Sequence, residues 1–203
     1  MYLRPTKDKL IGNFVILEKL STNKHLFDLY ENSHSDDQQD TIFTFMMFGP
    51  FRSQDDFKNW LISQESLTDR IIYSVYSKRI GQYVGMCSII NIDENFGRAE
   101  IGSIWYGKIA QRTEINSESI YLLLDYLLSD LKYRRIEWKC DNDNNASKSA
   151  ATRLGFDFEG IFRKHMIVRN KNRDTAWFSI IDDDWQSKKK YLQENVIKEY
   201  RKI

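Results

Sequence analysis

Residues 110–118, AQRTEINSE, form a polar stretch between an aromatic segment and an apolar segment with helical spacing. The first turn of a helix offers backbone N–H groups without intrahelical partners and the positive end of the helix dipole, and both favour an anion such as a phosphate. An ordinary surface connection has the same composition, because most strand-to-helix turns bind no ligand. The stretch is therefore a candidate phosphate site, with a plain connection as the alternative.

Metal and disulfide chemistry are not expected. The cysteines and histidines are few and scattered, and none falls in a Cys-x-x-Cys or His-Glu-x-x-His spacing. They are Cys87, Cys140, His25, His34 and His165. Two cysteines are also too few for a disulfide framework.

The composition indicates a globular domain. The chain has 203 residues, with 30 Lys and Arg against 29 Asp and Glu, and this balance does not favour a nucleic-acid or membrane partner. We expect a single domain over 1–203, with a core over about 10–185 and a C-terminal helix over 186–203. There is no apolar run long enough to span a membrane and no long apolar segment at the start, so a cytoplasmic location is expected.

The periodicity of apolar residues alternates between strand and helix patterns. It predicts strands over 13–20, 71–77, 82–92, 98–106, 134–140, 156–168 and 174–182. It predicts helices over 21–33, from Ser53 to 67, along the apolar stripe from Ile120 to Leu131, and over 141–156 with Gly155 as its end. Residues 40–51 are expected to form a loop, and 169–173, RNKNR, a turn between the last two strands. This order predicts an α/β (α+β) fold, a mixed and mostly antiparallel sheet of about seven strands flanked by helices.

Four segments in this order resemble the GNAT superfamily of acetyl-coenzyme A dependent N-acetyltransferases, in particular the branch of ribosomal-protein N-terminal acetyltransferases. They are FGPF (48–51) with the following DDFKNWL, AEIGSIWYGKIAQRTEINSE (99–118), CDNDNNASKSAATRLGFDFEG (140–160) and GIFRKHMIVRNKNRDTAWFSIIDDDW (160–185). The resemblance covers about residues 10–185. It implies a splayed pair of central strands, acetyl-CoA as cosubstrate without a metal, and an amine acceptor; a homodimer stays open.

The resemblance also implies cofactor contacts. The backbone at Ile104 and Trp105 would face the pantetheine arm, and Asn144 and Ser147 would lie near the arm and the thiol. Asn144 could equally serve only as a helix cap. The pyrophosphate would lie against the N–H groups of Gln111, Arg112, Thr113, Glu114, Ile115 and Asn116.

The family pattern has small residues where this chain has Glu114 and Asn116. A carboxylate at Glu114 would repel a pyrophosphate unless it pointed outward, whereas Arg112 could pair with phosphate oxygens.

Acetyl transfer to an amine needs a neutral nucleophile, a stabilised oxyanion and a proton for the departing thiolate. The Glu and Tyr that some family members use are replaced here by Lys139 and Ala151. Ser147 is the candidate acid, with a plain helix residue as the alternative. Glu100 is the candidate base, with an exposed strand carboxylate as the alternative. A site without a strong base favours an α-amine of a protein or a small amine.

Side chains near the first loop and the last hairpin could line an acceptor cleft, although most aromatic residues at such positions are core. The candidates are Phe45, Phe48, Phe51, Trp138, Arg163, His165, Asp174 and Trp177. Two other functions remain open: a catalytically degenerate acyl-CoA-binding module that senses or scaffolds, and a GNAT fold that binds no acyl-CoA.

Overall fold

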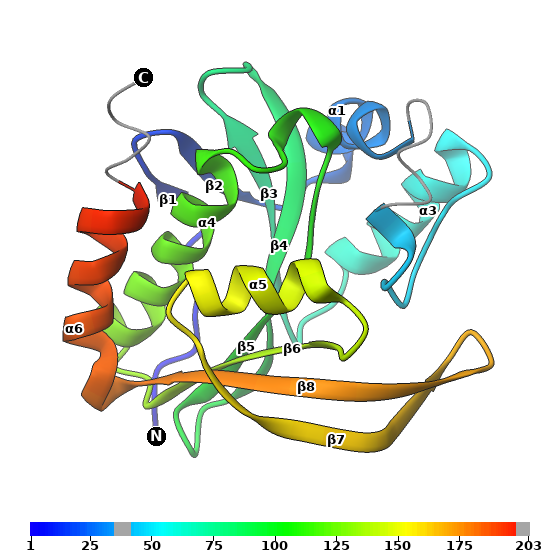
Figure 1. The fold of residues 1–203 in the computed structure, drawn as a ribbon. Helices are drawn as coiled ribbons and strands as arrows, with labels where there is room; N and C mark the ends of the chain where they lie inside the picture. Colours follow the sequence, from blue (N-terminus) through cyan, green and yellow to red (C-terminus); the bar gives the residue numbers. More distant parts are fainter. Residues whose placement is uncertain (35–41, 198–203) are drawn as a thin grey trace.

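The computed structural model describes residues 1–34 and 42–197, and these build one eight-stranded sheet with the order β1-β2-β3-β4-β5-β6-β8-β7 (Figure 1). Within it, neighbouring strands are antiparallel except the parallel pair β5 and β6. The strands are β1 (Lys9–Ile11), β2 (Val15–Lys19), β3 (Ile71–Ser77), β4 (Gln82–Asp93), β5 (Arg98–Tyr106), β6 (Arg135–Asp141), β7 (Asp157–Val168) and β8 (Lys171–Ile181). The predicted mixed, mostly antiparallel sheet is confirmed.

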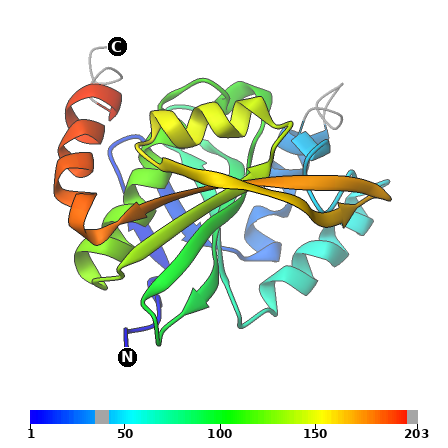
Figure 2. The same cartoon turned by 60° about the horizontal axis from the view of Figure 1, so that its bottom comes forward.

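Helices cover both faces of the sheet (Figures 1 and 2). The α4 face packs against α4 (Glu114–Leu124), its π-helical extension (Asp125–Asp130), α5 (Asn145–Arg153), α6 (Asp182–Tyr191) and a last π-helical turn (Leu192–Ile197). The α1 face packs against α1 (Thr22–His34) and α3 (Gln54–Glu65). A short 3-10 helix (Lys108–Ala110) precedes α4.

Two apolar clusters hold these layers together. The larger one lies under α4, where the predicted stripe is buried from Ile120 to Leu128. The smaller one lies under α1 and α3 and includes Phe43, Phe57 and Trp105. The first residues of the predicted loop, 40 and 41, lie outside the described residues, and the rest of the loop packs into the smaller cluster through Phe43.

Helix ends follow local capping chemistry. Ser53 caps α3 by accepting a hydrogen bond from the backbone N–H of Asp56 (3.1 Å), as the sequence predicts. The C-terminal helix begins at Asp182, directly after β8 and before the predicted position 186, because three acidic residues favour the first turn of a helix.

Three sequence expectations about strands need correction. The sheet has eight strands instead of about seven, because the three-residue β1 is too short to show a period. The turn between the last two strands is Arg169–Asn170 and not 169–173. Both residues have positive φ (51° and 61°), which is the geometry of a two-residue hairpin turn, so β8 already starts at Lys171.

No helix in the described ranges is both long and apolar enough to cross a lipid bilayer.

Candidate active site

Strands β5 and β6 are paired only at their beginnings. Their parallel register holds for three residue pairs and ends at Glu100 and Glu137. Beyond this point β5 stays with β4 up to Tyr106, whereas β6 follows β8 to Asp141. From Ile101 onward, the edge of β5 that faces β6 therefore has no strand partner. This β5–β6 gap is the predicted splay, and it is visible between the diverging ribbons of Figure 2.

A β-bulge accounts for the divergence. Between Met86 and Ser88, one residue of β4 stands opposite two residues of β5, Ser103 and Ile104. Ser103 has a φ of 51°, and an extra residue of this kind bends its strand and increases the twist. Ile104, in the bulge, and Trp105, directly after it, were predicted to face a pantetheine arm, and both belong to the part of β5 without a partner on the β6 side.

The start of α4 is fixed by its own loop. Thr113 caps the helix: its Oγ1 accepts from the N–H of Ile115 (3.3 Å) and donates to the carbonyl of Ala110 (2.7 Å). Gln111 Nε2 donates to the carbonyl of Tyr106 (3.0 Å), and Arg112 is exposed with a φ of 60°. The loop side chains thus shape the turn, while the first amides of α4 point out of the helix.

Glu114, which departs from the family pattern, is buried and engaged. Its Oε1 accepts a hydrogen bond from Arg79 Nε (3.1 Å) on the β3–β4 turn. The carboxylate is therefore neutralised by a neighbouring cation. Asn116, the second departure, has a buried Oδ1 without a partner in the described residues.

The start of α5 joins a cap to the predicted acid. Asn144 Oδ1 accepts from the N–H of Ser147 (3.0 Å), so Asn144 does cap the helix. Ser147 Oγ accepts from Trp138 Nε1 (3.0 Å). Because an indole nitrogen can only donate, the Ser147 hydroxyl keeps its own proton for another acceptor. One nearby acceptor is Cys140: burial raises the pKa of its thiol, and a hydrogen bond from Ser147 opposes this rise.

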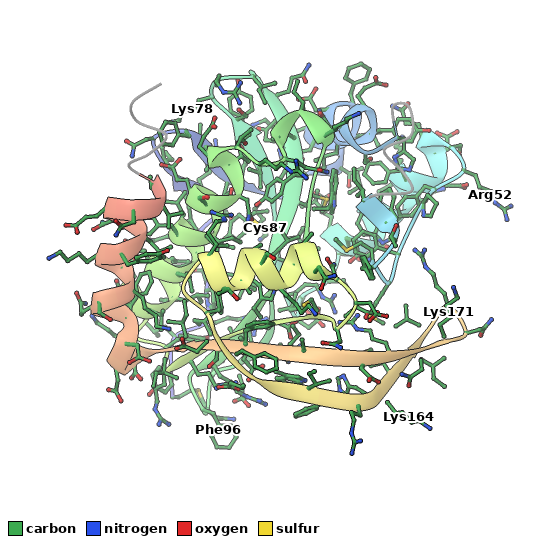
Figure 3. All side chains as sticks on the ribbon, in the orientation of Figure 1. Arg52, Lys78, Cys87, Phe96, Lys164 and Lys171 are labelled. Carbon is green, nitrogen blue, oxygen red and sulfur yellow. The ribbon has the colours of Figure 1, made fainter. Side chains whose placement is uncertain are left out.

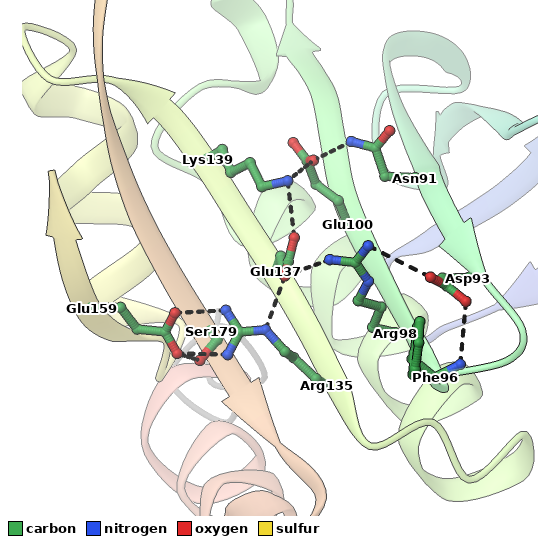
Figure 4. A network of polar contacts seen from close by, with 10 residues as sticks. All are labelled: Asn91, Asp93, Phe96, Arg98, Glu100, Arg135, Glu137, Lys139, Glu159 and Ser179. Carbon is green, nitrogen blue, oxygen red and sulfur yellow. Dashed lines mark hydrogen bonds and ion pairs between the residues drawn. The ribbon is translucent and has the colours of Figure 1, made fainter. Parts of the chain in front are cut away.

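Glu100, the predicted base, is buried and belongs to a charged network on the α1 face (Figure 4). Its Oε2 accepts from Asn91 Nδ2 (2.7 Å) and lies 2.9 Å from Lys139 Nζ, which also lies 2.9 Å from Glu137 Oε2. The alternative of an exposed strand carboxylate is wrong. Gly102 has no side chain, and a Cβ atom at this position would lie 3.3 Å from Glu100 Oε1. This oxygen therefore lies over Gly102, at the start of the gap.

The network continues away from the gap. Arg135 Nε donates to Glu137 (2.9 Å), and the Arg135 guanidinium forms two bonds of 2.6 Å with Glu159. Burial favours a higher pKa for the Glu137 carboxyl, but the hydrogen bonds and charges of Lys139 and Arg135 outweigh it and lower the pKa below its usual value. Lys139 thus occupies a fixed position at the edge of the gap.

Strand alternation separates two of the predicted wall residues. Trp138 is 4 % exposed and lies in the cluster of the α4 face, against Phe156. Its neighbour in sequence, Lys139, is paired with Trp177 of β8 on the α1 face, and Lys139 Nζ lies 4.0 Å from the centroid of the Trp177 ring. Trp138 therefore does not lie on the same face of the sheet as Trp177. Both were expected to line one cleft because the pairing of β6 with β8 could not be read from the sequence.

Two of the predicted wall residues of the hairpin, His165 and Trp177, come together around Phe162, which the sequence did not single out. The Phe162 ring is 4.5 Å from the Trp177 ring, and His165 meets both rings edge-on at 5.6 and 6.0 Å. His165 Nδ1 is 3.0 Å from Thr175 Oγ1, so this histidine already has a partner. Arg163 is exposed to solvent.

The hairpin tip is tied to the loop after α1. Arg169 Nη2 donates to the carbonyls of Phe48 (3.2 Å) and Gly49 (2.6 Å). Phe48 itself stacks on Trp60 of α3, with ring centroids 4.5 Å apart. Two segments more than a hundred residues apart in sequence thus enclose one side of the gap.

The sequence did not single out Arg173. It falls within the predicted turn, but in the structure it belongs to β8, on the same face as Trp177. Its Nε is buried and has no hydrogen-bond partner in the described residues. The signal that could have identified it is Asn170, because asparagine tolerates the positive φ that a two-residue hairpin turn requires.

Both cysteines are buried and reduced, and burial raises the pKa of the Cys87 thiol. In the described ranges, no group of three or more His, Cys, Asp or Glu side chains is arranged to hold a metal.

A family model for the acetyltransferase (GNAT) domain matches residues 15–157. A crystal structure of a GCN5-related N-acetyltransferase from Brucella melitensis superposes with a TM-score of 0.92 and 34 % identity, over 100 % of this chain and 97 % of that one. A second structure with the same fold is the microcin C7 self-immunity acetyltransferase MccE, solved with acetyl-CoA and AMP. It has 22 % identity and a TM-score of 0.73, and 84 % of this chain and 93 % of that one are covered.

Among curated proteins, the uncharacterized N-acetyltransferase p20 from Bacillus licheniformis is 29 % identical over 113 residues. This match spans 56 % of the present chain and 63 % of p20, so it covers less than two thirds of that relative. The splayed sheet, the bulge in β5 and the two helix starts fall within the region matched by the family model. The chain belongs to the GNAT acetyltransferase family.

Proposed function

We propose that the protein transfers an acetyl group from acetyl-CoA directly to a primary amine, either an α-amine at a protein N-terminus or the amine of a small molecule. The observation that carries this proposal is the β5–β6 gap with two helix starts, those of α4 and α5, beside it. An activated acyl thioester would be the donor, and the chain supplies binding, orientation and proton transfer.

The residues around the gap fit coenzyme A. The first amides of α4 and the exposed Arg112 suit a pyrophosphate. Glu114 does not oppose it, because Arg79 neutralises that carboxylate. The orphaned Oδ1 of Asn116 suits an amide N–H, such as those of a pantetheine arm, and the unpaired edge of β5 offers further backbone partners.

The chemistry favours an acceptor that is easily deprotonated. Neutralising a lysine amine at pH 7 costs about 5 kcal/mol, whereas an α-amine costs about 1 kcal/mol. Lys139 and Ala151 stand where some family members have an acid and a tyrosine, and Glu100 is bound by Lys139 and Asn91. A site with so little free base is better matched to an α-amine or another amine of low pKa.

We assign proton transfer to two side chains. Ser147 would donate its hydroxyl proton to the departing thiolate, because Trp138 fixes its oxygen without using that proton. Glu100 would accept the proton of the amine, through Oε1 and a water molecule, because this oxygen faces the gap.

A thiol-release assay with a panel of amines tests the proposal. We expect acetyl-CoA-dependent release that is faster with peptide α-amines than with lysine side chains. Ser147→Ala should lower kcat by about 10- to 100-fold, the range of general acid catalysis, with little change in the KM for the amine. Ser149→Ala is the matched control, because Ser149 is exposed on the same helix.

Three other results would revise the proposal. Acetyl-CoA binding by calorimetry without any thiol release would favour a degenerate module that senses acyl-CoA. Absence of both binding and release would leave a GNAT fold with another role. Equal turnover in wild type and Ser147→Ala would remove Ser147 from the mechanism.

A further inference from the structure

Three buried N–H groups near the β5–β6 gap have no hydrogen-bond partner. Among the buried side-chain atoms without a partner in residues 1–34 and 42–197, Trp105 Nε1, Arg173 Nε and Trp177 Nε1 can act only as donors. Buried polar groups normally have a hydrogen-bond partner, and leaving one unpaired destabilises the protein. Arg173 and Trp177 share the α1 face of β8, and Trp105 lies in the cluster of the α1 face. This side of the gap is therefore rich in donors and suits a ligand rich in oxygen.

The same region carries an unbalanced positive charge. Residues 160–173 contain Arg163, Lys164, Arg169, Lys171 and Arg173 but no acidic residue, in a chain whose charges otherwise nearly balance. Lys164 and Lys171 project from the hairpin away from the body of the protein (Figure 3). The Arg169 guanidinium already donates hydrogen bonds to the carbonyls of Phe48 and Gly49. Arg173 alone among these five is partly buried, and no ion pair joins it to a carboxylate in the described part of the chain.

Arg173 lies near the end of β6, where the β5–β6 gap is open. Asn142, which follows β6, donates its N–H to the carbonyl of Asp174 (2.9 Å), and Thr175 is paired with Asp141 at the end of β6. The charge of Arg173 also acts on the thiol of Cys140, whose pKa burial raises and the guanidinium lowers. The guanidinium is therefore close to the open end of the gap, near the start of α5.

The neighbouring cation Lys139 cannot serve the same purpose. Its ammonium is shared between Glu100 and Glu137 and covered by the Trp177 ring. The acidic residue next to Arg173 in sequence, Asp174, is also engaged: its Oδ1 accepts from the N–H of Lys164 and from Asn172 Nδ2 (both 2.8 Å). Arg173 thus keeps an uncompensated charge at the side of the cleft.

We infer that the acceptor is an amine with an anionic oxygen group, a carboxylate or a phosphate, near its reactive nitrogen, and that Arg173 binds this group. A guanidinium can bind either group with two parallel N–H···O bonds. The inference rests on the proposed acetyl transfer, because it names the class of acceptor for that site. It makes Arg173 a specificity-determining residue.

The test compares acceptors that differ by one charge. Thiol release is measured with peptides that begin with Asp or Asn, with Glu or Gln, and with phosphoserine or serine, so that the arms also separate a carboxylate from a phosphate. We expect kcat/KM to be about 10- to 100-fold higher for the anionic member of at least one pair, as for a charge-assisted hydrogen bond. Arg173→Gln should remove this preference and leave the neutral members within about threefold.

Lys171→Gln is the matched control, because it removes the same charge from an exposed position on the same hairpin. It should retain the preference for anionic acceptors. Equal preference in wild type and Arg173→Gln, no preference in wild type, or an equal loss in Lys171→Gln would each overturn the inference.

A binding measurement separates this inference from the proposed function. Calorimetry with the acetylated peptides in the presence of CoA should show about 10-fold weaker binding of the anionic member to Arg173→Gln. If that loss appears although no amine releases thiol, the anion site stands and the proposed catalysis fails. If thiol is released but charge makes no difference in either assay, the acetyl transfer stands and the anion site fails.

Discussion

The two sides of the β5–β6 gap are built in different ways. The side where we propose that the cofactor binds, the cofactor side, is made mostly of backbone: the unpaired edge of β5 and the first amides of α4 and α5. The side where we propose that the amine binds, the acceptor side, is made of side chains from β5, β6 and β8, held in a network of ion pairs and ring contacts. A backbone site depends on the position of a helix start, whereas a side-chain site depends on each residue and its register.

This difference explains why the two kinds of departure from the family pattern change the site to different extents. Glu114 replaces a small residue on the cofactor side, yet the helix start remains, because Thr113 caps it and Arg79 takes up the carboxylate. Lys139 replaces a carboxylate on the acceptor side, and there it reorganises the chemistry by binding Glu100 and Glu137. We therefore expect substitutions on the acceptor side to have the larger effects.

The largest effect is expected for Lys139→Met. This change would leave Glu100 and Glu137 buried near each other without their shared cation, and breaking a buried pair in this way costs about 3–5 kcal/mol. The free energy of unfolding from urea denaturation should fall by this amount. The comparison is Lys19→Met, which removes an exposed pair with Asp8 at 3.7 Å and should cost less than about 1 kcal/mol. Similar losses in both variants would contradict the view that the acceptor-side network is a unit.

The next effect concerns pH and the α1 helix on the acceptor side. Burial lowers the pKa of His25 to about 4 from its usual value of 6.5, and its Nδ1 accepts a hydrogen bond from the N–H of Ser21 (3.1 Å). The unfolded chain therefore binds a proton at a higher pH than the folded one. His25 should have no effect on stability above about pH 7.5 and should destabilise the fold by about 3 kcal/mol as the pH falls from 6.5 to 4.

His25→Asn isolates this contribution, because its Oδ1 can still accept from Ser21. The difference in unfolding free energy between wild type and this variant should change between pH 7.5 and pH 4. A flat difference for His25→Asn would show that its proton is not coupled to folding.

A smaller effect is expected at the helix caps, where the two sides can be compared directly. Thr113→Ala removes the cap of α4 and Ser53→Ala the cap of α3, and each should cost about 1 kcal/mol of stability. Of these two variants, only Thr113→Ala should also raise the KM for acetyl-CoA, because α4 starts at the gap and α3 does not. An equal effect of both variants on that KM would argue against a cofactor site at the start of α4.

Much of the cofactor side could be predicted from sequence, because its signals are local. The alternation over 71–77 and 98–106 gives β3 and β5 with their observed bounds, and Asn144 and Ser53 cap the helices as their spacing predicts. Local spacing also indicates the anion-favouring start of α4. None of these inferences needs a contact between distant residues.

The acceptor side could not be predicted in the same way, since its contacts depend on register. Glu100 meets Lys139 only because β5 and β6 are parallel over three pairs, and no sequence period reveals this. Trp138, expected to line the cleft, lies on the α4 face, and its neighbour Lys139 lies on the α1 face instead. Successive residues of a strand point to opposite faces of the sheet. The position of Arg173 could not be predicted for the same reason. It falls within the turn expected over 169–173, whereas in the structure it belongs to β8.

The smallest effect is expected for Glu114→Gln, which tests whether a side chain affects binding on the cofactor side. Since the carboxylate is neutralised by Arg79, the change should cost less than about 1 kcal/mol of stability and leave the KM for acetyl-CoA within about twofold. The exposed Arg112, in contrast, is free to pair with phosphate, so Arg112→Gln should raise that KM by a larger factor. An improvement of about 10-fold in Glu114→Gln would show that the carboxylate does face the pyrophosphate. In that case side chains, and not backbone alone, would limit binding on the cofactor side as they do on the acceptor side.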